Sequence, residues 1–370
     1  MKFMEELSLF KEKICVYPFG RSFVPVLNHI EMMNRAIEIT ALVSPKGWGL
    51  VGNTYDNGRL HVASDFKNIP SDIDILLIPG FEQFPFFEDK AVERILEVVS
   101  QFKRVISYHK FSKKNEELLR MTLHNNFCLY ETFPDTTGFK IEPTYASERI
   151  LPISTPILAI AEMLDGTDAF EVGLALRAEF TNMGYKVVQI GSRPYCDVVG
   201  GNQIPNFMRY TTLSEVEKVF QFNRYVKYLS EKEDPDLIIL NVPDAIQSYD
   251  EKHTVGFGIL PYLIFKAVRV DFLIVCSIFY QDSPEIFEII NQACTYKFDT
   301  SVGLFHMSGL RFDIEKMERS KILYGEYLDS DTVDKYIEKS KEKYKIPIMN
   351  LKNNANISAA CELVIESLSK

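Results

Sequence analysis

Residues 159–192 read AIAEMLDGTDAFEVGLALRAEFTNMGYKVVQIGS and contain the pattern that decides the fold. An apolar strand, a glycine-containing loop, an amphipathic helix, Gly184 and a second apolar strand follow one another here. Val172, Leu176 and Phe180 recur every four residues and give the helix one buried face. This order is typical of a mononucleotide-binding unit, in which loop amides and the start of the helix hold phosphate. We therefore predict a P-loop-like unit.

The same alternation of short apolar runs and helical patterns extends in both directions, which predicts parallel sheets covered by helices. Downstream, the remaining apolar runs predict strands at residues 236–242, 271–279, 301–307 and 346–351, with helices at 170–183, 214–230 and 358–368. Upstream, strands are predicted at residues 13–19, 37–45, 73–81, 104–109 and 127–131, with helices at 23–34, 90–102 and 113–124.

These elements predict an α/β protein of two consecutive three-layer domains with mainly parallel sheets. Residues 1–135 form the Rossmann-like domain and residues 152–370 form a P-loop NTPase-like domain. The stretch 136–151 has no clear periodicity and is interpreted as the linker.

Composition narrows the classes of function. Of 370 residues, 46% are hydrophobic and 25% are charged, and the formal net charge is −10. This acidic balance argues against a nucleic-acid partner, because such proteins need a concentrated basic surface. The most apolar run, 257–268, contains Lys266 and is too short to span a membrane. The six scattered cysteines indicate reduced core residues, so we expect a cytoplasmic protein.

The loop that follows the first strand of the second domain is a degenerate Walker A sequence. Ala169 stands where the phosphate-binding lysine is expected, Asp168 replaces the glycine, and Phe170 and Glu171 replace the hydroxyls that meet magnesium. Two carboxylates repel phosphate, so ATP or GTP with Mg is disfavoured as a cofactor.

Two interpretations of this loop stay open. In the first, the amides of residues 166–169 still hold a small anion. In the second, the loop is an ordinary turn in which Gly166 provides the bend and Asp165 or Thr167 caps the helix.

Further candidates lie after neighbouring strands, where open α/β sheets bind their ligands. Arg193 follows one strand and is suited to an anion, while Cys196 is either a reactive thiol or a packed core residue. Asn241 ends another strand, and Asp244 either replaces the water-positioning acid or is a turn residue. The predicted cofactor-binding set is Gly166, Thr167, Asp168, Ala169, Phe170, Arg193, Asn241 and Asp244.

The first domain has a weaker candidate site. Its first turn contains Gly20 but no G-x-G-x-x-G pattern, so the sequence supports dinucleotide binding only weakly. Gly20 and Arg21 could form a small anion site, with Gly80 and His109 on the same sheet edge. The histidines show no spacing that favours a metal site.

Residues 167–196, TDAFEVGLALRAEFTNMGYKVVQIGSRPYC, and 253–276, HTVGFGILPYLIFKAVRVDFLIVC, resemble the clostridial peptide maturation system protein family. In layout, nearly the full chain also resembles a two-domain bacterial family with a Rossmann-like domain followed by a P-loop domain. The first resemblance implies an accessory role in maturing ribosomally made, post-translationally modified peptides. In that family's pattern a lysine stands where this chain has Ala169, which argues against nucleotide hydrolysis here.

These observations lead to one hypothesis, one alternative, and a third class of function, a Rossmann-type sensor that binds a small metabolite between the domains. The hypothesis is an accessory protein that binds a precursor peptide or a peptide-modifying enzyme on a degenerate nucleotide-binding scaffold. The alternative is an ATP- or GTP-dependent ligase or kinase that acts on a small carboxylate or a peptide. The sequence leaves the oligomeric state open, a homo-oligomer included.

Overall fold

The computed structural model describes residues 12–33, 36–81, 87–129, 139–141, 149–164, 166–209, 213–251, 253–281, 284–312 and 325–369. The chain forms two compact units: the first comprises Met1–Gly138 and Pro194–Gly200, and the second comprises Phe139–Arg193 and Gly201–Lys370. Each unit contains a seven-stranded, mainly parallel sheet, so the predicted fold class is confirmed. The sequence did not anticipate that Pro194–Gly200 belongs to the first unit.

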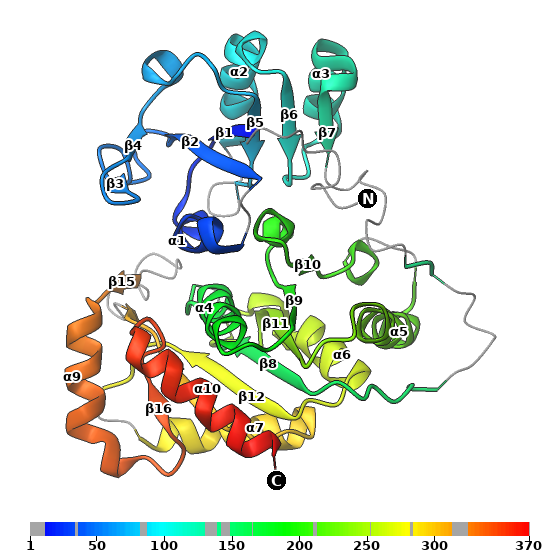
Figure 1. Cartoon of the computed structure of the whole chain (residues 1–370), viewed down its shortest axis with the longest axis vertical. Helices are drawn as coiled ribbons and strands as arrows, with labels where there is room; N and C mark the ends of the chain where they lie inside the picture. Colours follow the sequence, from blue (N-terminus) through cyan, green and yellow to red (C-terminus); the bar gives the residue numbers. More distant parts are fainter. Residues whose placement is uncertain are drawn as a thin grey trace. The chain divides into compact units, whose positions relative to one another are not determined.

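The first unit has the strand order β3-β4-β2-β1-β5-β6-β7, in which every neighbouring pair is parallel except the β3–β4 hairpin. Helices α2 and α3 pack on one face of this sheet and form its core with alternate strand residues (Figure 1). The bounds are β1 Glu12–Val16, α1 Val24–Met33, β2 Ile37–Val43, β3 Thr54–Tyr55, β4 Leu60–Ala63, β5 Ile75–Ile78, α2 Glu88–Val98, β6 Arg104–Ser107, α3 Lys113–Leu123 and β7 Phe127–Leu129.

The second unit has the all-parallel strand order β10-β9-β11-β8-β12-β13-β16, with a separate antiparallel pair formed by β14 and β15. The bounds of its strands are β8 Ile157–Glu162, β9 Val187–Gly191, β10 Asn202–Gln203, β11 Leu237–Ala245, β12 Phe272–Ser277, β13 Leu304–Met307, β14 Leu310–Phe312, β15 Gly325–Tyr327 and β16 Ile348–Met349. The bounds of its helices are α4 Ala169–Asn182, α5 Glu215–Glu233, α6 Ile259–Ala267, α7 Glu285–Phe298, α9 Ser330–Ser340 and α10 Asn354–Leu368.

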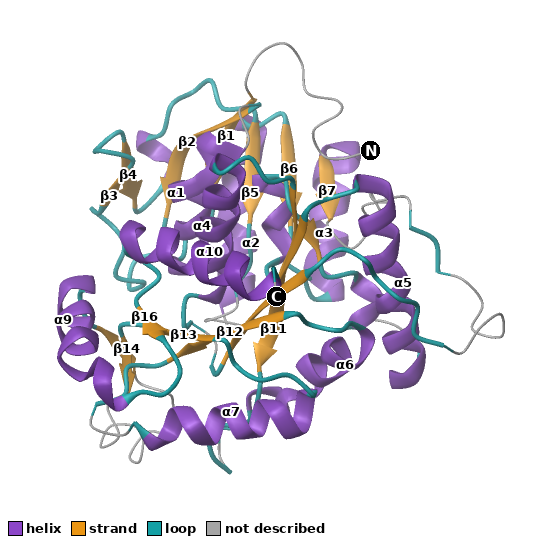
Figure 2. Ribbon diagram, turned by 60° about the horizontal axis from the view of Figure 1, so that its bottom comes forward, coloured by secondary structure: helices purple, strands orange, loops and turns teal. Residues whose placement is uncertain are grey.

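The helices of the second unit form two layers on opposite faces of its sheet. Helices α5, α6, α7 and α9 bury their apolar residues against one set of alternate strand residues. Helices α4 and α10 pack on the other set, and the two lie side by side in Figures 1 and 2. Because the strands are parallel, the loops after β8, β13 and β16 meet at one edge of the sheet.

The structure adds elements that the sequence analysis did not predict, including α6, α7, α9, the β3–β4 hairpin and the β14–β15 pair. Helix α6 lies within the apolar run 257–268. Its exposed residues Ile259 and Tyr262 are apolar like its buried ones, so the sequence shows no clear period. Helix α10 begins four residues before its predicted start, because the Asn353 side chain accepts a hydrogen bond from the Ala355 amide. Within the described ranges, no helix combines the length and apolarity that crossing a membrane requires.

Candidate functional site

The loop between β8 and α4 is a tight turn with two left-handed residues. Gly166 has φ +93°, and a Cβ there would lie 3.0 Å from the Tyr327 hydroxyl, which donates to the Gly166 carbonyl. Asp168 has φ +69° at the helix start and makes no side-chain cap. Thr167 is buried, and its hydroxyl donates to the Leu164 carbonyl at 2.9 Å. Gly166 therefore provides the bend as expected, but Thr167 closes the turn instead of capping the helix; Asp165 lies outside the described residues.

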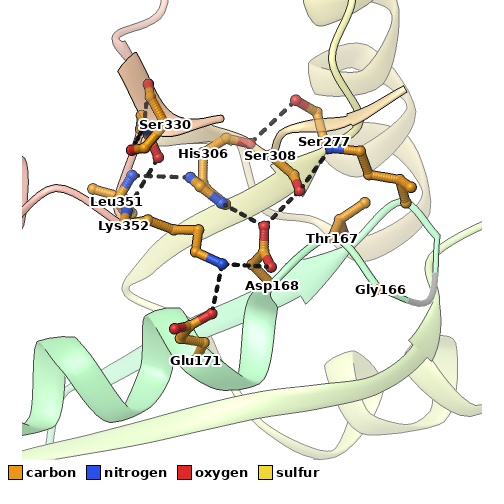
Figure 3. Close-up of polar contacts among 12 residues, drawn as sticks. Gly166, Thr167, Asp168, Glu171, Ser277, His306, Ser308, Ser330, Leu351 and Lys352 are labelled. Carbon is orange, nitrogen blue, oxygen red and sulfur yellow. Dashed lines mark hydrogen bonds and ion pairs between the residues drawn. The ribbon is translucent and has the colours of Figure 1, made fainter. Parts of the chain in front are cut away.

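The charged centre of the site is an ion-pair cluster at the start of α4. The Nζ atom of Lys352 lies 2.9 Å from Glu171 Oε2 and 3.4 Å from Asp168 Oδ1. Figure 3 shows the ammonium group between the two carboxylates. Lysine thus reaches this loop from the segment after β16, although Ala169 occupies the expected lysine position.

Two further side chains contact Asp168 from β13 and the residues after it. Ser308 donates its hydroxyl to Asp168 Oδ2 at 2.5 Å, and His306 Nε2 lies 3.5 Å from the same oxygen. The Leu351 amide donates to His306 Nδ1 at 3.0 Å, so the neutral ring carries its proton on Nε2, facing Asp168. This carboxylate therefore contacts three side chains (Figure 3).

The Lys352 backbone is held in place by its neighbours after β16. Asn350 is buried, and its side-chain nitrogen Nδ2 donates to Ser330 Oγ at 2.7 Å. Its side-chain oxygen accepts from the Lys352 amide at 3.2 Å, and its carbonyl accepts from Asn356. The start of α9 and the start of α10 therefore fix the backbone from which Lys352 extends.

The contacts in this cluster shift the pKa values of both partners. Burial alone would raise the pKa of Asp168, but His306, Lys352 and Ser308 lower it below its ordinary value. Burial alone would lower the pKa of Lys352, but the charges of Asp168 and Glu171 outweigh burial and raise it. Two carboxylates therefore share one lysine ammonium group in this cluster.

Asn241, predicted to bind a cofactor, lies fully buried beneath α4. Its amide nitrogen donates to the Ala169 carbonyl and its oxygen accepts from Gln189 Nε2, both at 2.7 Å. A Cβ on Gly173 would approach the Asn241 amide to 2.4 Å, so glycine is needed there. The nitrogen of Asn241 therefore supports α4 and its oxygen bonds to β9, so the protein itself uses both polar atoms.

The other predicted site residues lie apart from this cluster or in the core. Asp244 accepts a hydrogen bond from Arg209 at 2.7 Å at the end of β11. Arg193 follows β9, which β11 separates from β8 in the sheet. Ala169 and Phe170 are buried. Phe170 and Glu171 carry no hydroxyl at the positions that normally meet magnesium.

Sequence reasoning missed Lys352, His306 and Ser308. One signal was available, because Lys352 directly follows the strand predicted at residues 346–351 and thus belongs at the carboxyl edge of the sheet. His306 stands inside an apolar run and resembles an ordinary core residue in the sequence. Among the described residues, no three His, Cys, Asp or Glu side chains gather as a metal site would require.

Comparisons with known proteins show the fold. The chain is similar to a DUF1611 family protein from Anabaena variabilis, with a TM-score of 0.64, 9% identity, and coverage of 96% of this chain and 100% of that chain. Cobyrinic acid a,c-diamide synthase from Mycobacterium smegmatis has a TM-score of 0.36 at 12% identity, over 58% of this chain and 96% of that one. For McdA from Cyanthece the TM-score is 0.33 at 14% identity, over 58% and 99%. The sequence matches no known protein-family profile and no curated protein.

The Lys352→Met variant tests the ion pair. Removing the ammonium group leaves two largely buried carboxylates uncompensated, and we expect the free energy of unfolding to fall by about 1–3 kcal/mol, because solvent screens the half-exposed lysine. Chemical denaturation measures this change. Asp168→Asn with Glu171→Gln in the same chain should restore most of the loss. Lys341→Met, at an exposed pair with Glu338, is the matched control; equal effects of the two lysine variants would contradict the argument.

The pH dependence of stability tests Asp168. Its folded-state pKa is lowered, so its contribution is complete above the unfolded value of about 3.9 and is lost as the pH falls below it. We expect wild type to be more stable than Asp168→Asn at pH 7 and the difference to shrink below about pH 4. Asparagine also tolerates the left-handed backbone. Urea denaturation across this range measures it, with exposed Asp331→Asn as control; a pH-independent difference would contradict the assignment.

Proposed function

We propose that this chain is a non-hydrolytic binding protein in the maturation of a ribosomally synthesised, post-translationally modified peptide. It binds the precursor peptide or a peptide-modifying enzyme on a scaffold derived from a nucleotide-binding fold. The observation that carries the non-hydrolytic part is the Lys352–Asp168–Glu171 cluster in the phosphate loop. The resemblance of residues 167–196 and 253–276 to the clostridial peptide maturation family supports the pathway.

The cluster makes the loop a poor binding site for a triphosphate. A working P-loop offers backbone amides and an unshared lysine to several negative charges. Here the lysine already contacts two carboxylates. A triphosphate would therefore have to break these pairs and approach Asp168 and Glu171 within a few ångströms.

An ATP- or GTP-dependent ligase or kinase is the alternative, and one observation favours it. Lys352 brings an ammonium group to the loop from the segment after another strand. A cation is therefore present although alanine occupies the usual lysine position, residue 169. Magnesium has weaker support, because the Asn241 amide is bonded to the Ala169 carbonyl and Gln189, and Asp244 is paired with Arg209.

Isothermal titration calorimetry with ATP or GTP and magnesium separates the two functions. We expect wild type to show no micromolar binding of either nucleotide, for the electrostatic reason above. The Asp168→Asn, Glu171→Gln double variant removes the repulsion and releases Lys352, so it should bind more tightly than wild type. Micromolar binding by wild type would promote the enzyme, and the Asp244→Asn variant would then show whether Asp244 contributes to it.

Co-purification tests the proposed partner. Tagged wild-type protein should retain the precursor peptide or the modifying enzyme encoded beside it, and adding ATP or GTP with magnesium should leave the retained amount unchanged. The Lys352→Met, Asp168→Asn, Glu171→Gln triple variant keeps the fold without the charged cluster and serves as the matched control. If neither candidate associates with wild type, the peptide-maturation proposal is wrong.

A further inference from the structure

The first unit has a hollow at the place where its sheet changes direction. From β1 the chain proceeds to β2 and β4 on one side and returns through β5 on the other, so the switch point lies between β1 and β5. Open α/β sheets bind ligands outside the carboxyl ends of the strands at this point. The loops directly after β1 and β5 line the hollow. Its empty volume is about 360 Å³, a figure that includes open solvent at its mouth.

The side chains around this hollow provide one cation and aromatic surface. Arg21 is exposed at its edge, and Trp48 is half-buried and packs edge-on against Phe87 at a ring-centroid distance of 5.6 Å. Tyr195, from the Pro194–Gly200 segment, is buried and donates its hydroxyl to the Ser22 carbonyl at 2.7 Å. This bond anchors the loop that carries Arg21.

The backbone of the hollow is open because glycine stands at two positions. Gly80 has φ +146°, a conformation that side-chain-bearing residues rarely adopt. A Cβ on Gly20 would contact the Trp48 ring at 3.5 Å and occupy space next to the indole. Glycine at these two positions therefore keeps side chains out of the hollow at both strand ends.

We propose that this hollow binds a small organic anion, whose carboxylate or phosphate group pairs with Arg21 and whose body packs against Trp48. Arginine binds both headgroups through paired N–H donors, and a tryptophan ring contributes a large apolar face. The loop after β1 lacks the extra glycines that a pyrophosphate needs, which argues against a dinucleotide. This site is independent of the phosphate-loop cluster and goes beyond the proposed function.

Intrinsic fluorescence tests the site directly, because Trp48 is the only tryptophan in the chain. The full-length protein is titrated at constant ionic strength with four probes: inorganic phosphate, phenyl phosphate, acetate and benzoate. We expect a saturable change in Trp48 emission with at least one headgroup, in the millimolar range typical of such small ligands. The ring-bearing probe should bind more tightly than its ringless counterpart, and the effective headgroup identifies the class of ligand.

Variants assign the signal to Arg21. Arg21→Gln should weaken binding by about tenfold or more, and Arg21→Lys should keep part of the affinity. Arg94→Gln, which removes an exposed pair with Glu97, is the matched control and should bind the probe as wild type does. Unchanged binding in Arg21→Gln overturns the proposal. So does the absence of a saturable response to all four probes in wild type, a result that does not depend on any variant folding.

Discussion

The ammonium group of Lys352 neutralises carboxylates that the start of α4 cannot otherwise bury. Asp168 holds a left-handed backbone conformation that costs an L-residue about 1 kcal/mol or more, and its side chain is only 11% exposed. A buried charge needs a partner, and the carboxyl edge of the sheet provides one because β16 ends beside β13. The position of the last strand, the Asn350 bonds and the start of α10 all serve this contact.

The sequence was sufficient for the fold wherever a strand is buried on both faces. The apolar runs around residues 156–162 and 271–279 predicted β8 and β12, since central parallel strands are buried on both faces and are mostly apolar. Helix α6 was missed because its exposed residues Ile259 and Tyr262 are apolar like its buried ones, which hides the period that identifies a helix. The sequence could not predict that Pro194–Gly200 belongs to the first unit, because tertiary contacts and not the local sequence determine this assignment.

The candidate site was only half readable from the sequence. Asp168 and Glu171 were recognised because they interrupt a familiar spacing. Lys352 is nearly two hundred residues away, and only the sheet order places its strand end beside the loop. Asn241 is a residue for which the sequence suggested a ligand that the structure does not support. Its position at a predicted strand end suggested ligand binding, but it is buried beneath Gly173 and both of its polar side-chain atoms bond to protein groups.

The two units apply the same topological rule and reach different results. In each, strands are parallel and loops gather at the carboxyl edge, which is where such sheets bind ligands. In the second unit that edge is occupied by side chains that already satisfy one another electrostatically, so an incoming anion gains little. In the first unit the edge keeps a hollow with an exposed guanidinium group and an aromatic ring. The balance of charge, more than the fold itself, therefore decides which of the two edges is suited to an anion.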